Sequence, residues 1–415
     1  MSCILGSGRS LCFDSSLKCM EERHIGNAFL DQTHVFRESI PLLSSRTDLH
    51  KIGRPDDSYL HEVIFVIQSR NVDELTRIVD DVSDPESMNY GQHMTREQVV
   101  DLTSNPESSA VVSAYLHANG AAIMSVTPGE EFVTAQAPIS VWERLFKTRF
   151  YVIKQTHLDG DSTEAVRAEE YWLSNEIHSH VICVINTVEM PIIQKLGKSS
   201  AIDTESLRSR RLNIIGQLHN RLITPARLRI YYNMSNSQGN SLSTQVVFSG
   251  NLDYFSPLSL RYFQGNVSMQ PYQAAIIEVD DGHATDDPSI PEGDLTEGNL
   301  DMQYIMAMSP GSPTTYWHYT QGIARFIRDL AGKPRPSLVA SISYALSERS
   351  MTAGEYRIYE EWILKASAMG VTVFSASGDQ GANGGTNGTM SSCRYDASFP
   401  NSNPHTISVG ATTVR

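Results

Sequence analysis

Hydrophobic and polar residues alternate along the chain with two distinct periods. Residues 61–68 form a short, almost continuous apolar run that is typical of a buried strand, whereas residues 72–82 repeat apolar side chains at helical spacing. The same patterns predict short helices that begin at Thr95 and Asn105, a helix at 138–146, and strands at 123–126, 131–135 and 149–153. Strands and helices that interleave in this way indicate a compact α+β unit.

After Thr224-Pro225 the pattern changes: segments with strand periodicity alternate with segments with helix periodicity. Strands are predicted at residues 274–279, 338–343 and 371–375, helices at 297–308 and 354–369, and a mixed segment at 317–330. Strands separated by helices of this length form parallel sheets that helices cover on both faces. The predicted fold class is therefore α/β, a parallel sheet with helices on both faces, preceded by the α+β unit.

Residues 195–221 join the two units. Basic side chains stand there among Ser and Asn residues with little periodicity, which predicts an exposed linker. Exposed basic linkers are where proteases cut, so a processing site is one interpretation. A plain tether between domains fits the composition equally well.

The composition mainly excludes classes of partner and of protein. The 415 residues are enough for two domains with their own cores, and 40% hydrophobic with 19% charged residues is typical of a globular protein. The formal net charge of −14 argues against nucleic-acid and anionic-membrane partners, which need clustered Lys and Arg. The apolar stretch at 181–193 is too short and too interrupted to span a bilayer, so we expect no membrane partner.

The cysteines and the N-terminus do not identify a cellular compartment. The five cysteines are an odd number without a C-x-x-C pair, so we assign no metal ligand. Residues 1–26 lack the uninterrupted apolar core of a secretory signal and are interpreted as an untypical leader. A cytosolic protein with a disordered leader fits the same residues equally well.

The clearest candidate chemistry lies at the start of the helix predicted at 297–308. Glu297 and Asp301 stand four residues apart and so lie on one face of that helix. Two carboxylates at this spacing repel each other, and a shared proton removes the repulsion, which suits a general base that works at acidic pH. The alternative is structural: Asp294 caps the helix, and Glu297 and Asp301 merely favour its positive end.

Another acidic residue stands where parallel sheets carry their active sites. The β-branched run at 371–375 leads into Ser377-Gly378-Asp379, so that Asp379 follows the carboxyl end of a strand. Together the two segments resemble the sedolisin family of serine-carboxyl peptidases, which has a Glu and an Asp four residues apart and a Ser-Gly-Asp turn. The likeness covers about residues 55–415, with further matches at 339–344, Phe399-Pro400 and 409–412, and matches to the family's propeptide at 82–85, Tyr90-Gly91, 95–98 and 143–150.

The resemblance implies a division of the chain and a role for each acidic residue. It implies an untypical leader at 1–54, a propeptide (activation) domain at 55–194, a linker with a processing site at 195–221, and a subtilisin-like peptidase domain at 222–415. Glu297 would act as general base and general acid toward a serine hydroxyl, and Asp301 would orient Glu297. Asp379 would donate a hydrogen bond to the oxyanion, which a carboxylic acid does only while it is neutral.

The expected activity follows from these implied roles. It is hydrolysis of peptides or proteins at acidic pH, by an endopeptidase or a tripeptidyl peptidase that is made as a zymogen and inhibited by its own propeptide. The same resemblance implies a lysosomal or secreted location, and calcium in the full-length family.

The sequence departs from the family at the nucleophile and at the calcium site. The Gly-Thr-Ser motif that carries the family's serine does not occur in these residues, and the calcium ligands, which lie near the family's C-terminus, have no counterpart. We therefore expect a C-terminally truncated peptidase domain that is inactive alone. The alternative is a non-catalytic pseudoenzyme or an inhibitory binding protein from the same family. A glycosidase is less favoured, because its carboxyl groups face each other across a cleft.

Overall fold

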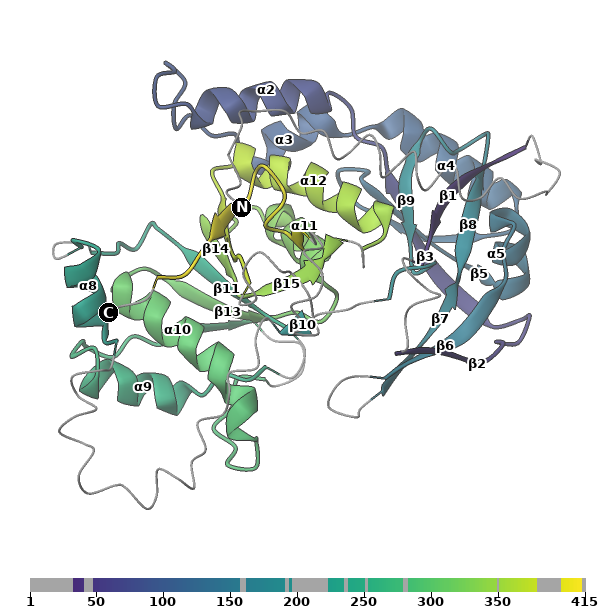
Figure 1. Ribbon diagram of the computed structural model, residues 1–415. Coiled ribbons are helices and arrows are strands. Elements are labelled where there is room, and N and C mark those ends of the chain that lie inside the picture. Colours follow the sequence, from purple (N-terminus) through teal and green to yellow (C-terminus); the bar gives the residue numbers. More distant parts are fainter. Residues whose placement is uncertain are drawn as a thin grey trace, which may run out of the picture.

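The computed structural model describes residues 33–40, 48–156, 162–190, 194–195, 223–234, 238–250, 253–278, 283–348, 351–378 and 397–412. These residues form two bodies that lie side by side (Figure 1). The first body, up to residue 190, contains antiparallel sheets, and the second body, from residue 223, contains a parallel sheet. Among these residues, none of the helices combines the length and the apolar character that a membrane span requires.

The main sheet of the first body consists of β4 (Ala122–Val126), β5 (Phe132–Pro138), β3 (Leu60–Ile67) and β9 (Val181–Ile185), in that order. Neighbouring strands are antiparallel throughout. Side chains of a strand alternate between the two faces of its sheet. In β3, Phe65 therefore packs in the core with α4 (Pro106–Ala118) and α5 (Ile139–Phe146), whereas Val66 packs in the core that continues into the second body.

Helices α2 (Val72–Ser83) and α3 (Arg96–Thr103) belong to the same body. α3 begins at the capping box that the sequence predicts: the Thr95 amide donates to Oε1 of Gln98 at 2.8 Å, and the Gln98 amide donates to Oγ1 of Thr95 at 3.3 Å. Asn105 caps α4, and Gly120 follows its end with a φ of +86°, a conformation that favours glycine. The helix starts predicted at Thr95 and Asn105 are confirmed.

Two smaller antiparallel groups complete the first body. β1 (His34–Ser39) pairs with β8 (Glu170–Ser174), and β6 (Phe150–Thr156) lies between β2 (Leu49–Gly53) and β7 (Ser162–Ala168). Of these five strands the residue pattern predicts only β6. β2 buries a single residue, Leu49, so its sequence lacks the alternation that identifies a strand.

The second body is built on a six-stranded parallel sheet in the order β12 (Ile276–Glu278), β13 (Thr314–His318), β11 (Gln245–Ser249), β14 (Val339–Ile342), β16 (Thr372–Ala376) and β18 (Ile407–Val409). Phe248 faces a core shared with α11 (Ile323–Gly332) and α12 (Ala353–Ala368). Val247, the residue before Phe248 in β11, points to the other face of the sheet. It packs there in a core with α9 (Pro257–Asn266) and α10 (Thr296–Met308). Helices cover both faces, so the predicted fold class is confirmed.

A short antiparallel sheet continues from the carboxyl end of β14. It has the order β10 (Gln194–Lys195), β15 (Tyr344–Ser347) and β17 (Ser398–Phe399). Gln194 pairs with Ala345 and Lys195 pairs with Tyr344, so β10 occupies one edge of β15. α8 (Pro225–Tyr231) opens the second body.

Helix α12 is the principal contact of the second body with the first (Figure 1). Trp362 of α12 stacks on Phe132 of β5 with ring centroids 5.7 Å apart. The Met94 amide donates to the carbonyl of Ala368 at 2.8 Å, at the other end of the helix. One apolar core thus runs through the interface, and the two bodies pack as parts of a single protein interior.

Gly354, in the first turn of α12, lies in close contact with the first body. A Cβ atom there would lie 2.6 Å from Cβ of Cys183 and 2.7 Å from Oε2 of Glu38. Gly354→Ala should therefore lower the free energy of unfolding by about 1–3 kcal/mol, measured by urea denaturation. Gly265→Ala in α9 is the matched control, since nothing lies within 4 Å of its added Cβ. Equal effects of the two substitutions would show that the interface is looser than described.

Candidate active site

The carboxylate pair lies in the first two turns of α10. The helix begins at Thr296, and its N-cap residue, Leu295, offers no side-chain hydrogen bond. Asp294 lies one residue earlier, in a 3-10 turn, so the interpretation that Asp294 caps the helix is wrong. Glu297 and Asp301 are both partly buried and lie one turn apart on the same side of α10.

A third carboxylate, Asp253, takes over the capping of α10. Its Oδ1 accepts a hydrogen bond from the Gly298 amide at 3.1 Å, and its Oδ2 accepts one from Oγ of Ser249 at 3.0 Å. Its exposed fraction is 2%. The first amides of a helix lack intrahelical partners, and an acidic side chain is favoured beside them. Asp253 therefore fixes the start of α10, and with it the position of Glu297.

Tyr344 links β15 to this acidic group. Burial raises the pKa of the Tyr344 hydroxyl well above its ordinary value, and the charges of Asp253, Asp301 and Glu297 raise it further, in decreasing order. The three carboxylates and the phenol are thus close enough to interact. Tyr344 therefore stays neutral beside these carboxylates.

The strands bring these residues to one edge of the sheet. Asp253 follows the carboxyl end of β11, and Tyr344 follows the carboxyl end of β14. Ligands and substrates of open α/β sheets bind at that edge. Asp379, which is also expected at this edge, lies outside the described residues. β16 ends at Ala376, and the description continues to Gly378, whose φ is +91°. Its role stays a prediction.

Aromatic side chains pack beside Asp253. His318 ends β13, opposite Ser249 of β11, and is fully buried. Its ring stacks on His283 with centroids 3.6 Å apart, and His283 stacks on Tyr254 at 4.2 Å. Sequence reasoning identifies neither these residues nor Asp253 and Tyr344. A residue of this kind can be found in a sequence by its position just after a predicted strand. Asp253 follows β11, but the residue pattern does not predict β11.

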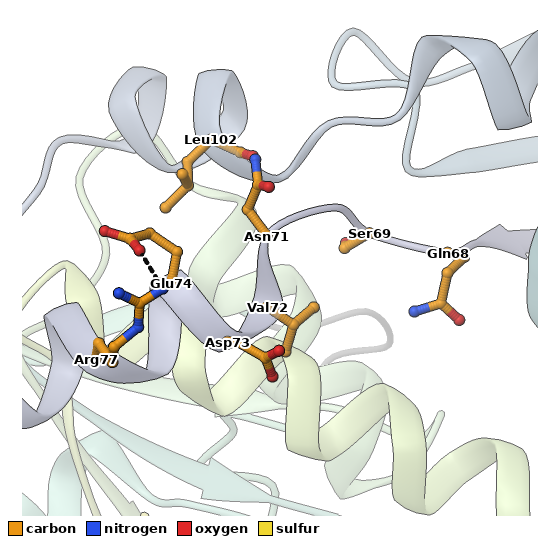
Figure 2. Close-up of a pocket in the computed structure, with 8 residues that line it drawn as sticks. All are labelled: Gln68, Ser69, Asn71, Val72, Asp73, Glu74, Arg77 and Leu102. Atoms are coloured by element: carbon orange, nitrogen blue, oxygen red, sulfur yellow. Dashed lines mark hydrogen bonds and ion pairs between the residues drawn. The ribbon is translucent and has the colours of Figure 1, made fainter.

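A hollow in the described surface lies away from this group. Figure 2 shows it at the start of α2 in the first body, with a volume of about 660 Å³. Three of the polar side chains there have partners: Nδ2 of Asn71 donates to the carbonyl of Leu102 at 2.8 Å, and Arg77 pairs with Glu74 at 2.5 Å. Neither Glu297 nor Asp301 lines this hollow, so it is separate from the candidate active site.

Comparisons with known proteins agree with the two-body organisation. Residues 47–190 match the family model of the pro-kumamolisin activation domain. Tripeptidyl-peptidase 1 of Homo sapiens is 27% identical over 384 residues, which covers 87% of this chain and 63% of the relative. Tripeptidyl-peptidase 1 of Dictyostelium discoideum is 26% identical over 386 residues (84% and 61%), and physarolisin of Physarum polycephalum is 26% identical over 378 residues (87% and 61%).

The chain spans less than two thirds of the length of these relatives. A solved structure, Pseudomonas sedolisin (serine-carboxyl proteinase) complexed with two molecules of pseudo-iodotyrostatin, is similar with a TM-score of 0.37 and 21% identity, over 46% of this chain and 54% of that chain. The family resemblance seen in the sequence is confirmed by the activation-domain match and the sequence relatives. Residues 47–190 thus match an activation domain, and the likeness to the tripeptidyl-peptidase 1 relatives extends over 84% to 87% of the chain.

Proposed function

We propose that the chain is part of an acid-acting serine-carboxyl peptidase that is made as a zymogen. The observation that carries the proposal is the meeting of Glu297 and Asp301 with Asp253 and Tyr344 at the carboxyl edge of the parallel sheet. Carboxyl groups that interact this closely keep protons at a pH where isolated ones lose them. Such a group is suited to proton transfer in acid, where a histidine base would be fully charged.

In this proposal each acidic residue has one task. Glu297 takes the proton of a serine hydroxyl and returns it to the leaving amine, and Asp301 holds Glu297 in the productive orientation. Asp253 positions Glu297 indirectly, through its hydrogen bond to the Gly298 amide. Asp379 donates a hydrogen bond to the oxyanion while it is protonated.

In this proposal the first body, together with the β10 segment that follows it, inhibits the site. β10 lies antiparallel on the edge of β15 at Tyr344, beside the acidic group. An extended peptide that adds to an exposed strand edge is a common way to bind a substrate, so β10 occupies a place suited to a peptide substrate. We propose residues 55–194 as the inhibitory domain, residues 195–221 as the linker that is cut on activation, residues 1–54 as a leader, and residues 222–415 as the peptidase domain.

The nucleophile is the part that the present sequence does not supply. No Gly-Thr-Ser motif occurs in it, so we propose that the chain alone does not hydrolyse peptides. Peptides or proteins in a lysosomal or secreted setting are the proposed substrates, cut internally or as N-terminal tripeptides. We assign calcium no ligand here. A non-catalytic member of the family that inhibits an intact relative is the second candidate, and the missing motif favours it.

Assay and peptide mapping of the native protein test the proposal together. Protein purified from its source should release product from peptides at about pH 4 and much less at about pH 7, because the acid groups must hold protons. Its peptide map should then include a Gly-Thr-Ser segment, and the purified 415-residue chain should be inactive in the same assay. Product release by the 415-residue chain would contradict the proposal that this chain lacks the nucleophile. A native form that carries the motif but has no activity in acid would contradict the proposed function.

A further inference from the structure

Ion pairs join the two bodies at two separate places, and both pairs are buried. Each consists of a carboxylate from the first body and a cation from the second: Glu189 with Arg325, and Glu131 with Lys365. The exposed fractions of these four side chains lie between 1% and 13%. Pairs of exposed charges contribute little to binding, whereas a charge that is buried at an interface needs a partner there.

Glu189 lies just beyond β9 and is held in place by the first body. Its Oε2 accepts hydrogen bonds from the amides of Thr187 and Val188, at 3.1 and 3.2 Å, and the amide of Asn186 donates to its Oε1. Arg325 of α11 is the group that the second body supplies, with its Nη2 2.6 Å from Oε1 of Glu189. The carboxylate therefore has a fixed position, and a cation of the second body meets it there.

Glu131 lies directly before β5 and takes part in the other contact. Nη2 of Arg96, from the same body, lies 2.8 Å from its Oε2, and Nζ of Lys365 lies 3.0 Å from its Oε1. Lys365 also pairs with Glu361, one turn earlier in α12, at 2.9 Å, and Oγ of Ser69 donates to Oε1 of Glu361. Charges of alternating sign thus run from the first body into the second.

The two contacts lie apart along α12. The charges of Glu189 and Arg325 both act on Glu355, in the first turn of the helix, whereas Lys365 lies near its other end. At 1.5 Å per residue, Glu355 and Lys365 are separated by about 15 Å along the helix axis. Contacts at two separated points fix the orientation of one surface on another as well as its position.

We propose that these contacts make the first body select its partner: it binds a second body that has a cation at positions 325 and 365, and it rejects one that lacks either cation. Forming a buried ion pair adds little net affinity, because the cost of removing two charges from water offsets their attraction. Losing one member of the pair is costly, because the other stays buried without a partner. Such contacts discriminate between partners more than they strengthen binding.

The consequence of this selectivity for inhibition rests on the proposed function, in which the first body is the inhibitory domain. Inhibition would then be limited to peptidases that carry both cations. A related peptidase with a neutral side chain at either position would leave Glu189 or Glu131 without that cation and would be held weakly. The contacts themselves do not depend on peptidase activity.

Two backbone amides report the contact between the bodies in the whole chain. The Gly354 amide donates to Oε2 of Glu38 at 2.7 Å, and the Met94 amide donates to the carbonyl of Ala368 at 2.8 Å. Both hydrogen bonds cross between the bodies, one at each end of α12, so both amides should exchange with solvent faster when the contact loosens. Labelling glycine and methionine with ¹⁵N allows both exchange rates to be measured at neutral pH.

The wild type, Glu189→Gln, Arg325→Met and the double variant form the test. Each single substitution should lower the protection of the Gly354 amide by about 10²-fold or more, because it leaves a buried charge without its partner. The double variant should recover protection to within about tenfold of the wild type, since its two neutral side chains match. Each form of the first body would then prefer the second body that matches it.

Arg77→Met is the matched control. Arg77 pairs with Glu74 within α2, and the pair is exposed, so protection should stay within a factor of about two of the wild type. A double variant that is no better protected than the single variants would overturn the selectivity, because the pair would then only add strength. Single variants as well protected as the control would also overturn it.

The second contact provides an independent test of the same kind. Lys365→Met should lower the protection of the Met94 amide, and adding Glu131→Gln and Glu361→Gln should restore part of it. If the Arg325 variants do not fold, this comparison decides, and no restoration would overturn the selectivity. A native protein without acid activity would contradict the proposed function but would leave these exchange results unchanged.

Discussion

Glu297→Gln in the longest native form of the protein should reduce kcat/KM for peptide hydrolysis in acid by about 10²–10⁴-fold. Glutamine has nearly the shape of glutamate but cannot accept the serine proton. The hydrogen bond from the Gly298 amide to Asp253, which fixes the start of α10, is a backbone contact and survives the change. The measurement is the initial rate of product release at about pH 4, with circular dichroism to confirm an intact fold.

Asp294→Asn is the matched control for this substitution. Asp294 is also acidic and lies three residues earlier, but its contact with Tyr254 is made by its backbone carbonyl, at 2.8 Å. We expect its activity within a factor of about two of the wild type. If Glu297→Gln were as active as this control, Glu297 would not be the general base, and Asp301 would be the next candidate.

Lys365→Met should lower the free energy of unfolding by about 3–5 kcal/mol, because it leaves the buried Glu361 without its cation and leaves Glu131 with Arg96 alone. Nζ of Lys365 lies 3.0 Å from Oε1 of Glu131, 2.9 Å from Oε1 of Glu361 and 3.1 Å from Oγ of Ser69. Lys365 has an exposed fraction of 0%. Glu131 and Ser69 belong to the first body, so the substitution should also weaken the contact between the bodies; urea denaturation at neutral pH measures both effects together.

Lys333→Met provides the comparison for Lys365. Lys333 also pairs with a glutamate, Glu278, and lies over a tryptophan ring, that of Trp317, but its ion pair is partly exposed. A solvent-screened pair of this kind contributes about 0–1 kcal/mol. Adding Glu131→Gln and Glu361→Gln to Lys365→Met should recover part of the lost stability. Equal losses in the two lysine variants would mean that burial does not govern the Lys365 cluster.

The sequence predicts the elements whose pattern is local. α2, α10 and α12 carry helical periodicity or caps, and β3 and β16 are short apolar runs between recognisable turns, so their positions follow from neighbouring residues. β9 is apolar throughout and has five consecutive buried residues. A run of that kind has no period, and it does not distinguish a strand from a buried helical segment.

The candidate site could be predicted in part for the same reason. Glu297 and Asp301 are neighbours in one helix, so their spacing alone places them together. Asp253 and Tyr344 reach them only through the order of strands in the sheet, which a single sequence does not reveal. The contact of Lys365 with Glu131 joins residues more than two hundred positions apart, and no local pattern indicates it. Asp379 remains predicted by its motif.

The hydrogen bond between Glu38 and Gly354 has a practical consequence for studies of the activation domain in isolation. Glu38 lies on β1, before residue 47, where the match to the family model begins. A recombinant inhibitor cut at that family boundary would retain the sheet of the activation domain but lack the acceptor for the α12 amide. Inhibition constants measured with such a fragment would then understate how strongly the intact activation domain holds its partner.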